Sequence, residues 1–289
     1  MVEFALQSQD PADAARAEAA GFVAFLVADH PGTGVSPFAT LAHAAAGTTT
    51  ISLGTYVVNA GVREPLHIAA DVATLDMLSG GRALLGIGAG HTPAEWRMIG
   101  RTALSAPERV TRLIESVEVI RRVLAGETVT FHGEHIHADG AALAQPRAVP
   151  LLIGGGNTRL LQYAGEHADI VGISGLGRTL ADGHTHEVRW HTDDVDRTIA
   201  HVRAAGRTPV IDALVQHVEI TTDRTAAAEK LTHEIPQFTA ADLLACPYVL
   251  IGTEDQLVAE VRSHHDRWGI DRFTVRASAL DAIAPLIPT

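Results

Sequence analysis

The segment from residue 71 to residue 93, DVATLDMLSGGRALLGIGAGHTP, constrains the fold of this chain more than any other. Its first half has the apolar spacing of a helix, and Gly80-Gly81 ends that helix because glycine takes the left-handed cap conformation without a Cβ penalty. The apolar run RALLGIG that follows has the length of a strand buried on both faces. A helix followed by such a strand is typical of a parallel sheet in an α/β protein.

Three glycines fall on alternate positions of this strand and its exit, at Gly86, Gly88 and Gly90, so they lie on one face. Glycine weakens a strand, and three in register therefore indicate that another group approaches the backbone closely. Either a bound group makes that approach, or the strand lies at a tight corner or in a crowded barrel interior. Both interpretations fit the segment.

The rest of the chain continues the alternation of strands and helices. Its 289 residues suit a barrel of eight strand-helix units, which takes about 250 residues. We therefore predict an α/β fold, a (β/α)8 TIM barrel, as a single domain over residues 1–289 with insertions after strands four and six. An open Rossmann-type sheet is the alternative, but the first strand-to-helix turn has no dinucleotide fingerprint. The eight predicted strands cover residues 2–7, 22–30, 51–60, 82–88, 150–156, 169–175, 210–221 and 271–278.

Two segments interrupt the alternation. Residues 127–149 contain TVTFHGEHIHADG, which predicts a small hairpin inserted in the barrel. Residues 177–194 are polar and rich in histidine, which favours a mobile loop. Residues 237–252, QFTAADLLACPYVLIG, are predicted as a helix followed by a loop.

Composition restricts the class of partner. A formal net charge of −12 argues against a nucleic-acid backbone or an anionic membrane surface. The single cysteine, Cys246, excludes an internal disulfide framework and fits a reducing cytoplasm. We find neither a signal peptide nor an apolar run of the roughly 18 residues that span a bilayer. We expect a soluble cytoplasmic protein whose partner is a small-molecule substrate.

Histidines cluster in both interrupting segments, at residues 132–137 and 184–191. No cysteine accompanies them and no HExxH helix is present, so their spacing does not resemble that of a zinc site. We predict exposed polar loops there and no metal.

The active face of a (β/α)8 barrel is built from the carboxyl ends of its strands. After the fifth strand, the sequence GGGNTR leads straight into a helix, so backbone N–H groups and the positive helix end can converge on a phosphate. A flexible turn with a capped helix fits the same residues equally well. The strand-end rule selects Asp29-His30, Tyr56 to Asn59, Gly90-His91, Gly154 to Thr158 and Ser174-Gly175.

The segment LDMLSGGRALLGIGAG resembles the signature of the luciferase-like oxidoreductase superfamily, which is close to LDxLSxGRxxxGxGxG. Members of that superfamily are (β/α)8 barrels that bind either FMN or the 8-hydroxy-5-deazaflavin coenzyme F420. The stretch IGGGNTRLLQYAGEHADIVGI is similar to the segment that holds the cofactor phosphate. The resemblance implies phosphate contacts at Gly155, Gly156, Asn157 and Thr158, and contacts with the cofactor tail at Ser174 and Gly175.

The stretch LGTYVVNAG is similar to the third strand of the superfamily, where a non-prolyl cis peptide commonly forms a bulge behind the ring system. In this chain that bond would join Tyr56 to Val57, and the resemblance implies cofactor contacts at Tyr56, Val57 and Asn59. An ordinary trans strand with Tyr56 in the core is the alternative.

Asp29 and His30 are similar to the polar pair that superfamily members place beside the redox ring, which implies a cofactor contact for Asp29 and proton transfer or substrate binding for His30. Without the resemblance, the pair fits a capping aspartate and a solvent-facing histidine. His91 follows GAG, where relatives often carry a carboxylate or a bulky aromatic, so it either replaces that group in catalysis or only shapes the pocket. Glu95 and Trp96, one turn later, could reach the rim of the pocket, but packing in the core or at the surface is favoured for both.

These features predict an F420-dependent oxidoreductase that transfers a hydride between the deazaflavin C5 and a small organic substrate. The segments ATLDMLSGGR and PLLIGGGNTRLL look more like the deazaflavin branch of the superfamily. An FMN-dependent luciferase-like monooxygenase that uses oxygen is the alternative, and a non-catalytic barrel is a third possibility. Many relatives are dimers, so we expect a homodimer as one option.

Overall fold

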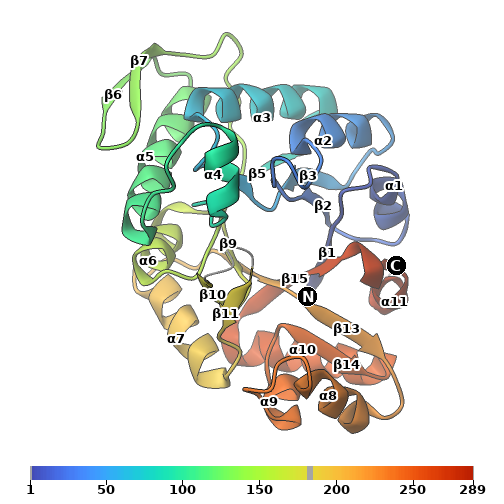
Figure 1. The fold of residues 1–289 in the computed structure, drawn as a ribbon. Helices are drawn as coiled ribbons and strands as arrows, with labels where there is room; N and C mark the ends of the chain where they lie inside the picture. Colours follow the sequence, from blue (N-terminus) through green and yellow to red (C-terminus); the bar gives the residue numbers. More distant parts are fainter. Residues whose placement is uncertain (1, 181–184, 289) are drawn as a thin grey trace.

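Eight parallel strands close into a barrel with helices around it (Figure 1). The structure, a computed structural model, describes residues 2–180 and 185–288. The third and fourth strands pair through Leu53 with Ala83 and Gly54 with Leu84, which closes the ring and confirms the predicted (β/α)8 barrel. In chain order the strands are β1 (Glu3–Gln7), β2 (Ala24–Val27), β3 (Ser52–Thr55), β5 (Ala83–Gly88), β8 (Leu151–Gly154), β9 (Ile170–Ile173), β12 (Val210–Leu214) and β15 (Ile270–Arg276), and β4 (Val58–Asn59) extends β3 along β5.

A helix follows each strand and packs on the outside of the barrel (Figure 1). The helix before β5 ends at Gly80 in the left-handed conformation, φ 71°, as predicted. None of the helices in the described part combines the length and the apolar character that a bilayer span requires. These outer helices are α1 (Ala12–Ala19), α2 (Pro37–Ala46), α3 (Pro65–Ser79), α5 (Ala106–Leu124), α6 (Thr158–His167), α7 (Thr192–Arg203), α10 (Glu254–Trp268) and the short α11 (Leu280–Ile283), with 3₁₀ turns at Ala277–Ala279 and Ala284–Leu286.

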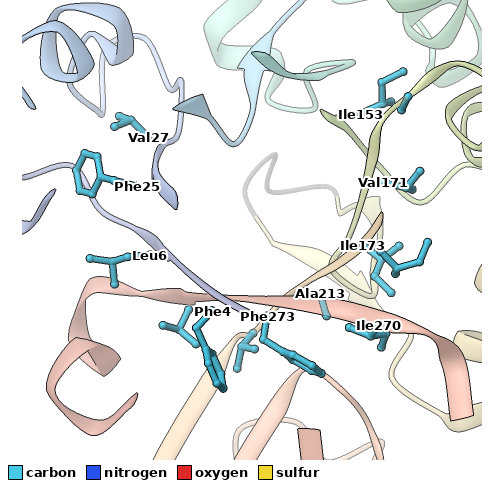
Figure 2. Close-up of a cluster of buried hydrophobic side chains, with 14 of the residues drawn as sticks. Phe4, Leu6, Phe25, Val27, Ile153, Val171, Ile173, Ala213, Ile270 and Phe273 are labelled. Carbon is cyan, nitrogen blue, oxygen red and sulfur yellow. The ribbon is translucent and has the colours of Figure 1, made fainter. Parts of the chain in front are cut away.

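The main core lies between the strands and the helices, because side chains alternate between the two faces of a strand. Phe4 of β1 and Phe273 of β15 point outward with ring centroids 6.2 Å apart, and Figure 2 shows them among the other outward-facing apolar residues. A smaller cluster fills the interior of the barrel, where Ala5, Leu26 and Leu152 lie.

The three alternate glycines of β5 are required by the neighbouring strand. A Cβ at Gly86 would lie 1.8 Å from the carbonyl oxygen of Thr55, and one at Gly90 would lie 1.9 Å from Oδ1 of Asn59. The close approach inferred from the sequence is therefore made, at these positions, by β3 and β4 in a crowded interior.

Of the two segments predicted to interrupt the barrel, residues 127–149 are as expected and residues 177–194 are not. Residues 127–149 contain the expected hairpin, formed by β6 (Val129–His132) and β7 (His137–Ala141). The prediction of an irregular loop over residues 177–194 is wrong for most of its length, because β10 (Leu176–Thr179) and β11 (His186–Val188) form an antiparallel hairpin and α7 already begins at Thr192. Residues 181–184, between the two strands, lie outside the described residues.

A further excursion follows the seventh barrel strand. The single strand predicted for residues 210–221 is divided into β12 and β13 (His217–Ile220), and the predicted loop after Cys246 contains a strand, β14 (Val249–Gly252). β13 and β14 pair in parallel as a separate small sheet, and α8 (Arg224–Thr232) and α9 (Ala240–Ala245) lie between them in the chain.

Candidate active site

A cavity of about 470 Å³ opens at the carboxyl ends of the barrel strands. This is the end at which (β/α)8 enzymes carry their active sites. All the site residues predicted from the sequence line it except Thr158 and Gly175. Those that line it are Asp29, His30, Tyr56, Val57, Asn59, His91, Gly155, Gly156, Asn157 and Ser174.

The floor of the cavity carries the predicted cis peptide bond between Tyr56 and Val57. The Val57 side chain packs against two glycines, since a Cβ at Gly88 or Gly154 would come within 2.5 Å or 2.9 Å of its methyl groups. Tyr56 points down into the barrel, where its hydroxyl donates to the carbonyl of Asp212 at 3.4 Å. Val57 therefore forms an apolar bulge on a glycine surface, which a flat ring can cover.

The glycine turn after β8 leads directly into α6 at one side of the cavity. A Cβ at Gly156 would lie 2.9 Å from the carbonyl oxygen of Leu176, so the turn has little room for a side chain. Asn157 caps the helix, with Oδ1 accepting from the N–H groups of Arg159 at 3.0 Å and Leu160 at 3.3 Å. Its amide oxygen caps the helix, and the backbone N–H groups of the turn are donors that can contact an anion.

Arg109 adds a cation to the same cavity. It lies in the first turns of α5, lines the cavity and donates to the carbonyl of Leu104 at 2.8 Å. Burial lowers the pKa of its guanidinium, and no carboxylate among the described residues is paired with it. Arg109 is therefore a cation of the cavity that is available to an anionic ligand.

Asp29 is held by protein groups. Arg63 donates to its two oxygens at 2.7 Å and 3.0 Å, and the backbone N–H of Asn59 donates to it at 3.1 Å. Asp29 is buried, so this pairing satisfies a charge that would otherwise be unfavourable. Its place in the wall of the cavity is as predicted, but its carboxylate anchors β4 to the end of β2.

His30 forms a hydrogen-bonded pair with Glu95. The imidazole Nδ1 lies 2.8 Å from Oε1 of Glu95, and Oε2 of Glu95 accepts from Nδ2 of Asn59 at 2.6 Å. Glu95 is buried, whereas the side chain of His30 is 39% exposed toward the cavity. The bond to Glu95 raises the pKa of His30, so a larger fraction of the imidazole is protonated near neutral pH.

His91 has the opposite electrostatic character. Burial and the neighbouring His186, whose ring centroid is 4.4 Å away, lower the pKa of His91 to about 4. His91 is therefore neutral near pH 7. It can offer a hydrogen bond from an imidazole N–H, whereas His30 can exchange a proton.

Ser174 and Gly175 lie on the β10–β11 side. The Ser174 hydroxyl accepts from the N–H of Leu176 at 3.3 Å, and Trp190 Nε1 donates to the Ser174 carbonyl at 3.4 Å. Gly175, φ 62°, lies under Trp190 and does not line the cavity. Thr158, the first residue of α6, is exposed outside the cavity.

The histidine clusters do not form a metal site in the described part of the chain, where no three metal-ligating side chains come together. His184 lies outside the described residues. His186 instead lies in the cavity wall, and His191 precedes α7, where it contacts Asp242 at 3.5 Å.

Five charged residues of the cavity were not predicted from the sequence as part of the site, namely Glu95, Arg109, Arg178, Arg189 and Arg276. Glu95, predicted to serve in packing, and Arg109 lie in helices that follow β5, namely α4 (Pro93–Met98) and α5, and strand-end reasoning does not reach them. Arg276 is the last residue of β15, so the strand-end rule applied to the eighth strand would have found it.

The comparisons with known proteins agree with this geometry. The chain is 29% identical over 260 residues to 5,10-methylenetetrahydromethanopterin reductase of Methanolobus tindarius, covering 88% of this chain and 69% of that protein. It is 29% identical over 282 residues to the F420-dependent glucose-6-phosphate dehydrogenase of Amycolatopsis mediterranei, covering 88% and 84%. The solved structure of the coenzyme F420 dependent tetrahydromethanopterin reductase from Methanopyrus kandleri superposes with a TM-score of 0.75 at 21% identity, over 99% of this chain and 98% of that one.

The family match spans nearly the whole barrel. Residues 12–282 match the family described as luciferase-like monooxygenase. The chain therefore belongs to the luciferase-like monooxygenase family, whose barrel it has.

Proposed function

We propose that this protein is an F420-dependent oxidoreductase that transfers a hydride between the C5 of the deazaflavin and a small organic substrate. The observation that carries the proposal is one cavity that joins the Val57 bulge, the glycine turn before α6 and the His30–Glu95 pair. Relatives named for F420 support the choice of deazaflavin.

The residues present fit such a group. Val57, raised on Gly88 and Gly154, would support one face of the ring system. The backbone of Gly155 and Gly156, with Arg109, would hold the phosphate at the positive end of α6. When bound, the deazaflavin would supply a hydride donor or acceptor at C5.

His30 would exchange a proton with the substrate on the open side of the ring. Its bond to buried Glu95 keeps it oriented and favours the protonated imidazole, which suits the donation of a proton to a carbonyl oxygen as that carbon gains a hydride. The reverse reaction would use the neutral form as a base. His91, neutral near pH 7, would orient the substrate by a hydrogen bond.

Cofactor titration tests the proposal. Purified protein is titrated with F420 and with FMN in parallel, followed by fluorescence, and oxygen consumption is measured after reduction of each complex. We expect tighter binding of F420 and no oxygen consumption. The competing function is an FMN-dependent monooxygenase, and the family description, luciferase-like monooxygenase, supports the monooxygenase part of it. Preference for FMN together with oxygen consumption would establish it and reject our proposal.

The role of His30 has a separate test. We expect His30→Ala to bind F420 as the wild type does, yet to lose about 100-fold or more in kcat, because a general acid-base group contributes about that much. The matched control is His43→Ala, which removes an exposed histidine of α2 far from the cavity residues. Wild-type turnover in His30→Ala would rule out proton transfer by this residue.

A further inference from the structure

Arg276 is an arginine at the mouth of the barrel that has no acidic partner among the described residues. Arg276, the last residue of β15, lines the cavity and is partly buried. Its guanidinium donates to the side-chain oxygens of Gln7 and Gln216, the latter at 3.1 Å. Both acceptors are uncharged, and no ion pair to Arg276 is present among residues 2–180 and 185–288.

A second arginine of the same strand shows the contrast. Arg272 lies deeper in the barrel, where its Nε is 2.5 Å from Oδ2 of Asp212, and the Thr274 hydroxyl donates to the same carboxylate at 2.8 Å. The barrel therefore pairs the deep cation Arg272 with a carboxylate and leaves Arg276, at the cavity, without a counter-charge among the described residues. Since taking an unpaired charge out of water is unfavourable, the difference indicates that a ligand supplies the missing anion.

Both glutamines hold Arg276 in a fixed orientation. Gln7 Nε2 donates to the carbonyl of Tyr56 at 2.5 Å, and Gln216 Nε2 donates to the carbonyl of Leu214 at 3.0 Å. Each amide oxygen is thereby directed at the guanidinium. A guanidinium has five N–H donors, so further donors remain for a ligand in the cavity. Burial lowers the pKa of Arg276, a shift that a bound anion would oppose.

The carboxylates of the cavity are already engaged. Asp29 is taken by Arg63, and Glu95 by His30 and Asn59. The phosphate position has its own cation, Arg109, and lies at β8, which is separated from β15 in the ring by β9 and β12. The charge of Arg276 nevertheless acts on His30. Arg276 is thus placed to meet a group on the substrate near the residue that exchanges the proton.

We propose that Arg276 binds a carboxylate of the substrate, and that the substrate class is therefore small organic acids. The guanidinium matches the two oxygens of a carboxylate. With the carboxylate at Arg276, the reacting carbon would lie beside His30 over the ring. This inference deepens the proposed function and rests on it for the reaction, but the anion site itself does not depend on which flavin binds.

The test uses acetate as a minimal carboxylate and acetamide as its uncharged counterpart. Each is titrated into protein saturated with F420, at constant ionic strength, and binding is followed by the absorbance of the cofactor and by the thermal midpoint. We expect acetate to bind the wild type at least about tenfold more tightly than acetamide, because a hydrogen bond to a charged group exceeds a neutral one by about that factor. Equal binding of the two in the wild type would overturn the proposal without any variant.

Three variants locate the site. Arg276→Met should lose acetate binding by about tenfold or more while the Kd for F420 stays within about twofold. Arg276→Lys keeps the charge but not the two-pronged geometry, so its loss of acetate binding should be smaller than that of Arg276→Met. Arg189→Met is the control, because Arg189 also lines the cavity but is paired with Glu187 at 3.0 Å, and it should bind acetate as the wild type does. Unchanged acetate binding in Arg276→Met would reject the proposal, as would a loss of F420 binding in its place.

Failure of the proposed function would give a different result. If F420 does not bind the wild type, the same acetate and acetamide titrations are made with FMN-saturated or cofactor-free protein. Selective, Arg276-dependent acetate binding there would keep the anion site and reject only the deazaflavin.

Discussion

At the scale of single residues, the chemistry of the cavity depends on how its two histidines are separated in pKa. His30 lies against a buried carboxylate that raises its pKa, and His91 lies in an apolar, cationic setting that lowers its pKa to about 4. Two identical side chains, whose ring centroids are 5.8 Å apart, therefore differ in how readily each is protonated, His30 more readily than His91. One exchanges protons in our proposal, and the other only donates or accepts a hydrogen bond.

Glu95→Gln tests this arrangement. In the variant, the amide oxygen can still accept from Asn59, so its NH₂ would face Nδ1 of His30 and favour the neutral imidazole. The pKa of His30 should fall, and the fraction of enzyme able to donate a proton should be lost at lower pH than in the wild type. The pH dependence of kcat and the NMR titration of His30 measure the change.

Glu187→Gln is the matched control, because Glu187 pairs with Arg189 and does not contact His30. It should leave the titration of His30 unchanged. A pKa of His30 that is the same in Glu95→Gln as in the wild type would contradict the electrostatic role given to Glu95.

The rule that active sites lie at the carboxyl ends of barrel strands was sufficient to predict Asp29, His30 and Asn59 as cavity residues. Glu95 and Arg109 were not found because they lie in helices, where the direction of a side chain depends on how the helix packs over the barrel mouth. Nor could the sequence show that Asp29 is engaged by Arg63, 34 positions away in the chain.

At the scale of elements, the connection from β8 to α6 is the part of the site that local sequence specifies best. Glycines and an asparagine cap follow a buried strand, and the structure places the turn in the cavity wall with Asn157 capping the helix. The Asn157 oxygen caps the helix, and the phosphate contacts expected at Gly155, Gly156, Asn157 and Thr158 stay predictions.

Gly156→Asp and Gly156→Asn separate charge from shape at this turn. Both variants place a side chain of the same size near the Leu176 carbonyl, so both carry the same steric strain. Only the aspartate adds a negative charge where the phosphate is expected, so it should weaken F420 binding by at least about tenfold more than asparagine does. Equal affinities, measured by fluorescence titration, would place the phosphate elsewhere.

The β10–β11 hairpin is an element that the amino-acid composition of its segment did not predict. Its polar residues predict a loop, yet antiparallel pairing between Leu176 and Val188 and between Thr179 and His186 satisfies their backbone groups. Thr179 also lies against His91, with its hydroxyl donating to the His91 carbonyl at 3.4 Å. Such pairing depends on what lies underneath the hairpin, which no local pattern of the sequence contains.

At the scale of the whole molecule, closure of the barrel depends on the glycines of β5, which have no side chains to keep β3 away. The carbonyl of Thr55 occupies the space that a Cβ at Gly86 would need. We expect Gly86→Ala to lower the free energy of unfolding by about 3 kcal/mol, because strands β3 and β5 would have to separate.

Gly47→Ala is the control for this effect. Gly47 follows α2 with φ −104°, and only the Ala44 carbonyl lies near its would-be Cβ, at 3.9 Å. Alanine there should be neutral or stabilise the protein by about 0.5 kcal/mol. Denaturant unfolding of both variants measures the difference, and equal stability would show that the barrel relaxes around Gly86.

The barrel itself could be predicted because strands of period two and helices of period 3.6 alternate along the chain. The small β13–β14 sheet could not, because its two strands lie on either side of two helices in the sequence and pair only in space. Val249, Leu250 and Ile251 are fully buried, and a short apolar run of this kind is compatible with strand, helix or buried loop.

The pairing of β1 with β15 has a consequence for synthesis. Gln7 and Arg276 are neighbours in the sheet although they are 269 positions apart. A ribosome synthesises the chain from its amino end at about 5–20 residues per second. One edge of β1 therefore stays unpaired until β15 emerges. Until β15 has been synthesised the ring cannot close, so β1 lacks its partner on one edge while the preceding residues are made.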